Sequence, residues 1–262
     1  MLFRSLYKKV KSDGFSVRVA DSLFLDDHYE SEIWKQIIQS EVKTPGTMVY
    51  SDLSMIILQK VIEHIAGCSI EQYVTDNFYK PMGLWRIVYN PKEKSSAFTI
   101  APTEDDKQFR NQIVCGTVHD PSAAMMGGVA GNAGLFSNAE SLAILFKMLV
   151  NGGAYDGKRY LKKETIQLFT SQGTPGSANR RGLIFDKPEP NKEKSGPTAK
   201  SASNLTFGHT GFTGTCVWAD PQNNFVYVFL SNRVYPDAEN TLLAKRNIRT
   251  DVMEQFYKTF LK

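Results

Sequence analysis

The stretch Phe207-Gly208-His209-Thr210-Gly211-Phe212-Thr213-Gly214-Thr215 leads into the most regular part of this chain of 262 residues. Two runs of β-branched and aromatic residues follow, 213–219 and 225–230, separated by Asp220-Pro221-Gln222-Asn223-Asn224. Because such runs favour strands and such a linker favours a turn, this part predicts a β-hairpin. Apolar residues recur at helical spacing over 238–261, which predicts a helix at the end of the chain.

Upstream of the hairpin, helical patterns alternate with irregular sequence. Apolar residues over 53–65 recur at spacings of three and four, and Gly67 follows where a helix would stop. Ser69 is expected to begin a second helix, and Ser137 a third that runs through residue 149. Residues 86–120 show no sustained period, and their acidic cluster Glu104-Asp105-Asp106 predicts a solvated loop, with a calcium contact as the alternative.

Strands late in the chain, a helical and irregular middle and a final helix together predict an α+β fold. We expect an antiparallel sheet flanked by helices, with a helical or irregular subdomain. The domain organisation expected from the sequence is a poorly defined N-terminal segment over residues 1–45 and a partial domain over residues 46–262.

Composition excludes some classes of protein. The 31 basic and 27 acidic residues are interspersed and the formal net charge is +4, so we expect no nucleic-acid partner. No apolar run reaches the ~18 residues of a membrane span. The start Met1-Leu2-Phe3-Arg4 lacks the long apolar segment of a secretion signal, and the location of the chain is left open on this basis.

A glycine-rich run over 127–134 has neither the spacing nor the Lys-Ser/Thr of a phosphate-binding loop, so we expect its small residues to allow close backbone packing. We expect no metal and no other cofactor. The cysteines and the remaining histidines, which show no metal-ligand spacing, are Cys68, Cys115, Cys216, His28, His64 and His119.

Three segments carry a resemblance to a known family: Tyr50-Ser51-Asp52 at a helix start, the glycine-rich run with Ser137 after it, and His209-Thr210-Gly211 before the hairpin. Their order and spacing resemble serine β-lactamases, penicillin-binding DD-peptidases and related esterases, in which S-x-x-K, Y-x-N or S-D-N, and K-T-G elements meet in one cleft. Segments such as Val118-His119-Asp120-Pro121 and Ser231-Asn232-Arg233-Val234-Tyr235-Pro236 resemble, within that family, the β-lactamase-like domains fused behind glycoside hydrolase family 3 enzymes of Bacteroidetes.

The resemblance implies roles for six residues. Tyr50 and His209 would be the catalytic residues retained here, with Tyr50 as the base for an attacking hydroxyl. Asp52, Thr210 and Gly211 would contact substrate, and the backbone N–H of Phe212 would form half of an oxyanion hole. His209 stands where the family usually has Lys and Asp52 where it usually has Asn, and both changes argue against tight recognition of a β-lactam carboxylate.

The nucleophile motif is the larger departure. A literal S-x-x-K occurs at Ser5-Leu6-Tyr7-Lys8 and at Ser40-Glu41-Val42-Lys43, a number that chance alone would supply. In the family a whole helical domain separates the nucleophile from the tyrosine, and neither serine leaves room for it. We therefore expect the chain to begin after the family's nucleophile.

The first hypothesis is accordingly a truncated serine hydrolase domain, inactive alone, whose parent transfers or hydrolyses acyl groups on peptidoglycan-type peptides, β-lactams or small esters. The alternatives are a non-catalytic module that binds peptidoglycan-type ligands, and a minimal esterase in which Ser5 serves. The resemblance implies a periplasmic or extracytoplasmic parent that can carry an upstream glycoside hydrolase domain. The strand over 225–230 should present an open edge, so self-association through strands is also expected.

Overall fold

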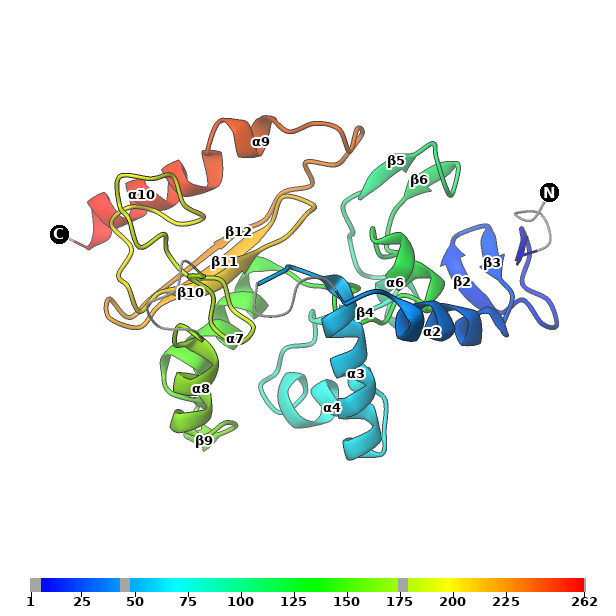
Figure 1. The fold of residues 1–262 in the computed structure, drawn as a ribbon, viewed down its shortest axis with the longest axis horizontal. Helices are drawn as coiled ribbons and strands as arrows, with labels where there is room; N and C mark the ends of the chain where they lie inside the picture. The colour runs from blue at the N-terminus through cyan, green and yellow to red at the C-terminus, as the bar shows by residue number, and fades with distance from the viewer. Residues whose placement is uncertain (1–5, 43–47, 174–178, 262) are drawn as a thin grey trace. The chain divides into compact units, whose positions relative to one another are not determined.

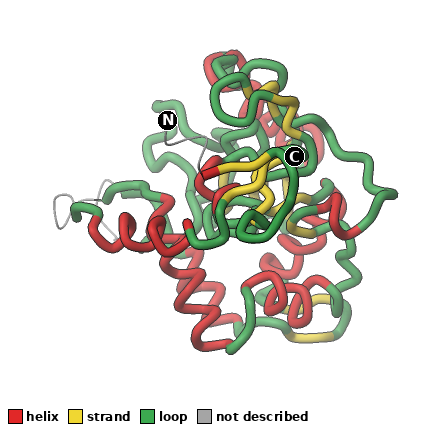
Figure 2. The backbone as a smooth tube through the Cα atoms, turned by 90° about the vertical axis from the view of Figure 1, so that its right-hand side faces the viewer, coloured by secondary structure: helices red, strands yellow, loops and turns green. Residues whose placement is uncertain are grey.

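The computed structural model describes residues 6–42, 48–173 and 179–261. The described chain forms two compact units, one made of the residues up to Asp76 with Ile87–Phe136, the other of Asn77–Arg86 with the residues from Ser137 on. Both consist of short helices and strands joined by long loops (Figures 1 and 2). The expected domain boundary after residue 45 differs from this division and stays a prediction.

The first unit contains small antiparallel sheets and helices. Its elements are β1 (Tyr7–Lys8), β2 (Val17–Ala20), β3 (Leu23–Leu25), α2 (Tyr29–Gln39), α3 (Asp52–Ala66), α4 (Ile70–Val74), β4 (Val88–Tyr89), α5 (Pro91–Lys94), β5 (Glu104–Asp106), β6 (Gln112–Val114), α6 (Pro121–Met125) and β7 (Leu135–Phe136). Strand β3 lies between β1 and β2, and β4 pairs with β7 and β5 with β6. The described residues of the N-terminal part, which show little regular pattern in the sequence, thus include strands β1 to β3 and helix α2.

The core of the first unit is built from small and medium side chains. Val19 and Leu25 of the β2–β3 sheet pack with Ala123 and Ala124 of α6 and with Ala130. Larger side chains, among them Tyr7, Tyr29 and Phe109, pack against this cluster and stay only partly buried.

Helix α3 has the ends that its sequence predicts. Ser51 is the N-cap, with its hydroxyl accepting from the N–H of Leu53 at 3.3 Å. Gly67 ends the helix in the left-handed region at φ 68°, where glycine avoids the strain of a side chain. Ser69 then caps α4, accepting from the N–H of Gln72, and a π-helical turn over Thr75–Tyr79 follows.

The acidic cluster is not the solvated loop that its composition predicts. Glu104–Asp106 is strand β5, and the carboxylate of Asp106 is buried. It accepts hydrogen bonds from the backbone N–H groups of Gln108, Phe109 and Arg110 at 2.8–3.1 Å. The carboxylate therefore fixes a turn, a role that composition alone does not reveal.

The second unit is organised around a three-stranded antiparallel sheet in the order β10-β11-β12. Its elements are α7 (Ala139–Val150), β8 (Ala154–Tyr155), β9 (Lys158–Arg159), α8 (Lys163–Thr170), β10 (Phe207–Thr210), β11 (Cys216–Asp220), β12 (Phe225–Phe229), α9 (Leu242–Lys245) and α10 (Ile248–Phe260). The predicted hairpin is confirmed as β11 and β12, and the predicted final helix as α10. Helix α7 begins one residue later than expected, because Asn138 rather than Ser137 is its N-cap.

Helices cover both faces of this sheet (Figure 1). Trp218 and Tyr227 face α10, where Met253 and Tyr257 complete a buried cluster. On the opposite face, Phe207 stacks with Phe146 of α7, and their ring centroids are 6.5 Å apart. The sheet is therefore a packed layer between helices, as the predicted α+β fold requires.

Strand β12 is the end strand of this sheet. It pairs with β11 in the register Cys216↔Phe229 to Asp220↔Phe225, and within the described residues no strand pairs with its other side. The open edge expected from the sequence is thus present in the part of the chain that the structure describes.

Among the described helices, no single one is long and apolar enough to cross a membrane. The pair Asp52–Ala66 and Ile70–Tyr79 passes that test only when its members are taken together, across a bend of 70°.

Candidate functional site

The H-T-G segment is the other end strand of the same sheet. His209 and Thr210 end β10, opposite Val217 and Cys216 of β11. The residue before them, Gly208, has to be a glycine. A Cβ atom at this position would lie about 2.0 Å from the carbonyl oxygen of Val217. The strand thus holds both polar side chains half-buried, one on each face of the sheet.

A tight turn follows the strand. The N–H of Gly211 donates to the carbonyl of Thr215 at 2.8 Å, and the N–H of Gly214 to that of Gly211 at 3.1 Å. Phe212 lies at the tip of this turn and is 65% exposed. Arg233 stacks on its ring and donates to its carbonyl at 2.8 Å. The backbone of Phe212, predicted to form half of an oxyanion hole, is therefore held in a fixed turn.

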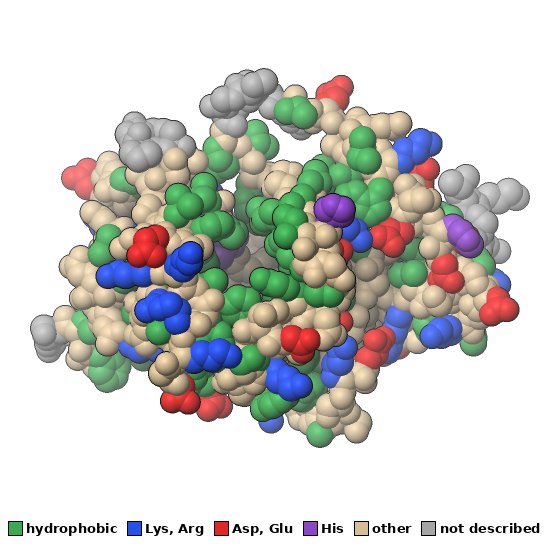
Figure 3. Space-filling view, turned by 90° about the horizontal axis from the view of Figure 1, so that it is seen from below, with side chains coloured by type: hydrophobic (Ala, Val, Ile, Leu, Met, Phe, Trp, Pro, Cys, Tyr) green, Lys and Arg blue, Asp and Glu red, His purple; other side chains and the backbone are tan. Residues whose placement is uncertain are grey.

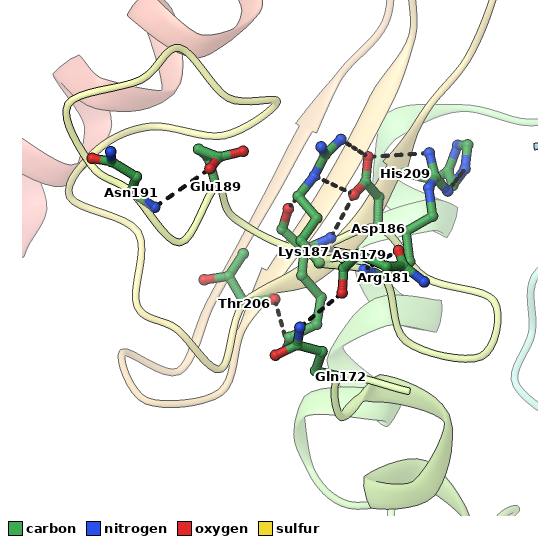
Figure 4. Close-up of polar contacts among 10 residues, drawn as sticks. Gln172, Asn179, Arg181, Asp186, Lys187, Glu189, Asn191, Thr206 and His209 are labelled. Atoms are coloured by element: carbon green, nitrogen blue, oxygen red, sulfur yellow. Dashed lines mark hydrogen bonds and ion pairs between the residues drawn. The ribbon is translucent and has the colours of Figure 1, made fainter. Parts of the chain in front are cut away.

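A cluster of charged side chains adjoins His209 (Figure 4). Arg181 Nη1 lies 3.0 Å from His209 Nε2, and Arg181 Nη2 lies 3.3 Å from Asp186 Oδ2. Arg180 binds the same carboxylate through two nitrogens, at 2.8 and 2.9 Å. His209 is therefore one member of a connected polar cluster.

Asp186 anchors this cluster to the sheet. Its backbone bridges to Gly208 of β10 through two hydrogen bonds of 2.8 and 3.1 Å, and its side chain is buried. The neighbouring Lys187 donates to the carbonyls of Thr170 and Thr206, and burial lowers its pKa below the usual value. The segment that contains Asp186 and Lys187 thus runs beside the H-T-G strand.

The other predicted site residues lie in the first unit. Tyr50 immediately precedes the N-cap of α3 and is 62% exposed. Asp52 is the first residue of that helix, where a carboxylate is favoured by the helix dipole. Because these residues and His209 belong to different units, their meeting in one cleft remains a prediction of the motif resemblance.

The glycine-rich run is shaped by close packing, as predicted. A side chain at Gly131 would meet the carbonyl oxygen of Met55 at about 2.1 Å. Gln59 of α3, itself buried, accepts from the N–H of Gly131 at 2.9 Å. The run therefore lies against the helix that Tyr50-Ser51-Asp52 begins.

The two literal S-x-x-K matches contribute little to a site. Ser5 lies outside the described residues, as does Lys43. Ser40 ends α2, and its hydroxyl donates to the carbonyl of Ile37 at 2.7 Å. The hydroxyl of Ser40 thus serves a helix end.

In the part of the chain that is described, no group of three or more His, Cys, Asp and Glu side chains is arranged to hold a metal ion. The polar groups at β10 can instead bind an anion or a carbonyl group. Arg181 and Asp186 were missed by sequence reasoning. The sequence feature that could have indicated them is the adjacent pair Arg180-Arg181 close before Asp186, in a segment otherwise rich in Gly, Pro, Ser and Lys.

The α+β architecture and the H-T-G strand define the β-lactamase/transpeptidase-like fold of serine hydrolases. Residues 14–250 match the family described as Beta-lactamase, and the chain belongs to it.

Curated relatives agree with this assignment. The chain is 34% identical over 202 residues to a protein of Escherichia coli K12 named "Putative D-alanyl-D-alanine carboxypeptidase", which covers 72% of this chain and 46% of the relative. A Salmonella typhi protein of the same name is 34% identical over 211 residues, covering 75% of this chain and 48% of the relative. The chain thus spans about half the length of these relatives.

Solved structures share the fold at low identity. Simvastatin synthase (LovD) from Aspergillus terreus has a TM-score of 0.60 at 13% identity, covering 90% of this chain and 63% of that one. EstCE1, described as a hydrolase with promiscuous acyltransferase activity, has a TM-score of 0.57 at 18% identity, covering 91% and 64%.

Proposed function

We propose that the chain binds peptides of the D-alanyl-D-alanine type at the H-T-G strand, as part of the acyl-transfer machinery of a DD-peptidase-like hydrolase. The observation that carries the proposal is β10 itself. Its His209-Thr210-Gly211 segment is an end strand with a fixed turn after it, in a member of the Beta-lactamase family. The relatives named D-alanyl-D-alanine carboxypeptidase support this class of substrate.

The roles follow from the chemistry of acyl transfer. Thr210 would hydrogen-bond a substrate carbonyl or carboxylate, with Gly211 allowing close approach of the substrate backbone. The N–H of Phe212 would stabilise an oxyanion. By the motif resemblance, Tyr50 would act as base and Asp52 would contact the substrate.

We infer that the chain by itself does not form a covalent acyl-enzyme. A tyrosine has an ordinary pKa of about 10, so it becomes a base near neutral pH only when a neighbouring cation lowers that pKa. The lysine of the S-x-x-K motif is that cation in the family, and neither literal match lies at the family's distance from Tyr50. A parent protein would supply both groups, and its fusion to a glycoside hydrolase remains a prediction.

A non-catalytic binding module is the alternative function, and labelling combined with ligand binding separates it from a working enzyme. A fluorescent penicillin should not label the chain, whereas diacetyl-L-Lys-D-Ala-D-Ala should raise its melting temperature. Thr210→Val should weaken peptide binding, since it removes the proposed hydrogen bond while keeping the β-branched shape. Thr241→Val, the same change at an exposed position of the same unit, is the control.

Covalent labelling that survives denaturation would contradict the proposed inactivity, and its loss in Ser5→Ala would favour the minimal esterase. Absence of peptide binding would overturn the proposed substrate class.

The open edge of β12 supports a second copy of this chain as a partner. Its residues Phe225–Phe229 read FVYVF and carry no charge to oppose edge-to-edge pairing, and an antiparallel edge can pair with its own copy. Sedimentation should show concentration-dependent dimers that Val228→Lys removes. Ile65→Lys, at an exposed position of α3, should leave them intact; the opposite result would place the contact on that helix.

A further inference from the structure

The segment Ser231–Arg233, which follows β12, holds three successive carbonyl groups of the turn after β10. The serine Oγ donates to the carbonyl of Gly214 at 2.9 Å, and the N–H of Arg233 donates to that of Thr213 at 2.9 Å. Arg233 Nε donates to the carbonyl of Phe212 at 2.8 Å. A short segment from one end of the sheet therefore fixes the turn at the other end.

A second arginine holds both ends of the same turn. Arg249 of α10 donates through Nη1 to the carbonyl of Thr215 at 3.0 Å and to that of Gly211 at 3.4 Å. These two residues also bind each other, because the N–H of Gly211 donates to the carbonyl of Thr215 at 2.8 Å. Every carbonyl oxygen from residue 211 to residue 215 thus accepts a hydrogen bond.

Arg233 also connects the turn to a third segment of its unit. Its Nη1 donates to the carbonyl of Ala238 at 3.0 Å and to that of Asn240 at 2.8 Å, while Nε holds Phe212. The guanidinium lies 4.5 Å from the centroid of the Phe212 ring. A guanidinium can bridge in this way because it is planar and presents several donors in fixed directions, whereas a lysine has one nitrogen.

These contacts determine the direction of the Phe212 N–H. A peptide group is planar and trans, so its N–H points away from its own carbonyl. The N–H of Phe212 shares a peptide group with the carbonyl of Gly211, which Gly214 and Arg249 hold. Fixing that carbonyl fixes the N–H, and the hydrogen bonds at the carbonyl polarise the amide and strengthen its N–H as a donor.

We propose that Arg233 and Arg249 are the positioning residues of the Phe212 N–H, one by bridging Phe212 to residues 238–240 and the other by closing the turn from α10. This inference rests on the proposed function, in which that N–H contacts the ligand. Both arginines act through the turn, and neither is a catalytic residue. Their benefit is preorganisation, because a donor that is already in place loses no freedom when the ligand binds.

Backbone dynamics of the unliganded full chain test the first part of the proposal. In wild type, ¹⁵N relaxation should give the amides of residues 211–215 order parameters of about 0.85, as in β11. Arg233→Gln removes the bridge, so the order parameter of the Phe212 amide should fall below about 0.6. Arg249→Gln should loosen the same amide from the other side of the turn.

Two further variants separate the bridge from other effects of an arginine. Arg246→Gln changes an exposed arginine of the same unit and should leave the turn rigid. Arg233→Lys keeps the charge but cannot reach Phe212 and residues 238–240 together, so it should behave like Arg233→Gln. A rigid turn in Arg233→Lys would show that charge alone is enough and would overturn the bridging role.

Titration with diacetyl-L-Lys-D-Ala-D-Ala tests the second part. The amide resonance of Phe212 should shift on saturation in wild type and in Arg246→Gln. Arg233→Gln should bind the peptide about fivefold more weakly, as loss of one hydrogen bond allows, with less than about half of the wild-type shift at Phe212. Circular dichroism and unchanged β11 resonances show that the variants fold, so a general loss of structure would not imitate this result.

The outcomes separate the two proposals. If wild type does not bind the peptide, the proposed function fails, and the role of the arginines in ligand binding fails with it. If wild type binds but the folded Arg233→Gln variant keeps both the rigid turn and the full Phe212 shift, only the inference is overturned. A mobile turn in unliganded wild type would overturn it as well, and that measurement needs no variant.

Discussion

The two units of the chain are stabilised by different kinds of interior. The second unit buries large aromatic side chains, with Trp218 and Phe207 each 1% exposed between the sheet and its helices. In the first unit the core contains alanines and valines, and Arg110 is buried beside Asp106, with its Nη2 donating to the carbonyl of His119 at 2.8 Å.

Their surfaces differ as well. Helix α3 of the first unit exposes Ile57, Val61 and Ile65, which follow one another at a spacing of four and so lie on one face. Figure 3 shows that hydrophobic side chains reach the surface over a broad area of the face it draws. The second unit therefore adds a buried aromatic layer to its own buried polar groups, whereas the first unit buries the Arg110–Asp106 pair and leaves an apolar helix face for further contacts.

The largest effect should come from the aromatic core. Trp218→Ala should lower the free energy of unfolding of the second unit by about 3–5 kcal/mol, because it removes a fully buried side chain. Trp85→Ala, at a 65% exposed position of the same unit, should change it by less than about 0.5 kcal/mol. Urea unfolding followed by circular dichroism measures both. Equal losses would show that the aromatic core is not what holds this unit.

A smaller loss of stability is expected in the first unit when its buried carboxylate is removed. Asp106→Ala should cost about 3 kcal/mol, since it removes three backbone contacts and leaves the charge of Arg110 buried without its partner. Asp105→Ala, at a more exposed position, is the matched control. Hydrogen exchange over residues 104–120 measures the effect, and protection as high as in wild type would refute the dependence of this unit on polar contacts.

The stability of the first unit should depend on pH through His119. Burial lowers the pKa of His119 below 6.5, although Glu104, whose Oε2 lies 2.9 Å from Nε2, opposes the shift. The unfolded chain therefore binds a proton that the folded chain does not, and stability should fall as pH decreases below about 6.5. Melting temperatures between pH 8 and pH 5 should show this slope, and His119→Gln should reduce it. His28→Gln, with a side chain 92% exposed, should keep the wild-type slope; a loss there instead would exclude His119 as the cause.

The smallest effect is expected on the exposed face of α3. Ile57→Gln should change the free energy of unfolding by no more than about 0.5 kcal/mol and should raise solubility. Ile56→Gln, one residue away but 2% exposed, should cost several times more, because it buries a polar group. Similar losses of stability at the two positions would mean that the face of α3 that carries Ile57 is covered in solution.

Local patterns were enough for the elements whose signals lie within one segment. The hairpin of β11 and β12 and the helices α3 and α10 follow from periodicity, and the cap at Ser69 and the stop at Gly67 follow from residue type. These features are decided by backbone conformation and by side chains within a few residues, so the sequence records them directly.

The acidic cluster shows where such reasoning stops. Composition placed Glu104-Asp105-Asp106 in water, but Asp106 is buried because three N–H groups of the following turn converge on it. A carboxylate can be buried when its hydrogen bonds replace those to water, and the sequence does not state whether they will.

The sequence by itself determined the family, the α+β class and the position of the H-T-G strand, because these depend on motifs and periodicities that persist in the linear order of residues. Only the tertiary structure decided which residue carries the charge beside His209. The bridge between Asp186 and Gly208 joins segments 22 residues apart and carries Arg181 to the imidazole. Hydrogen bonding between distant segments depends on how loops fold back on the sheet, and that information belongs to the packing of the whole unit rather than to any local stretch of sequence.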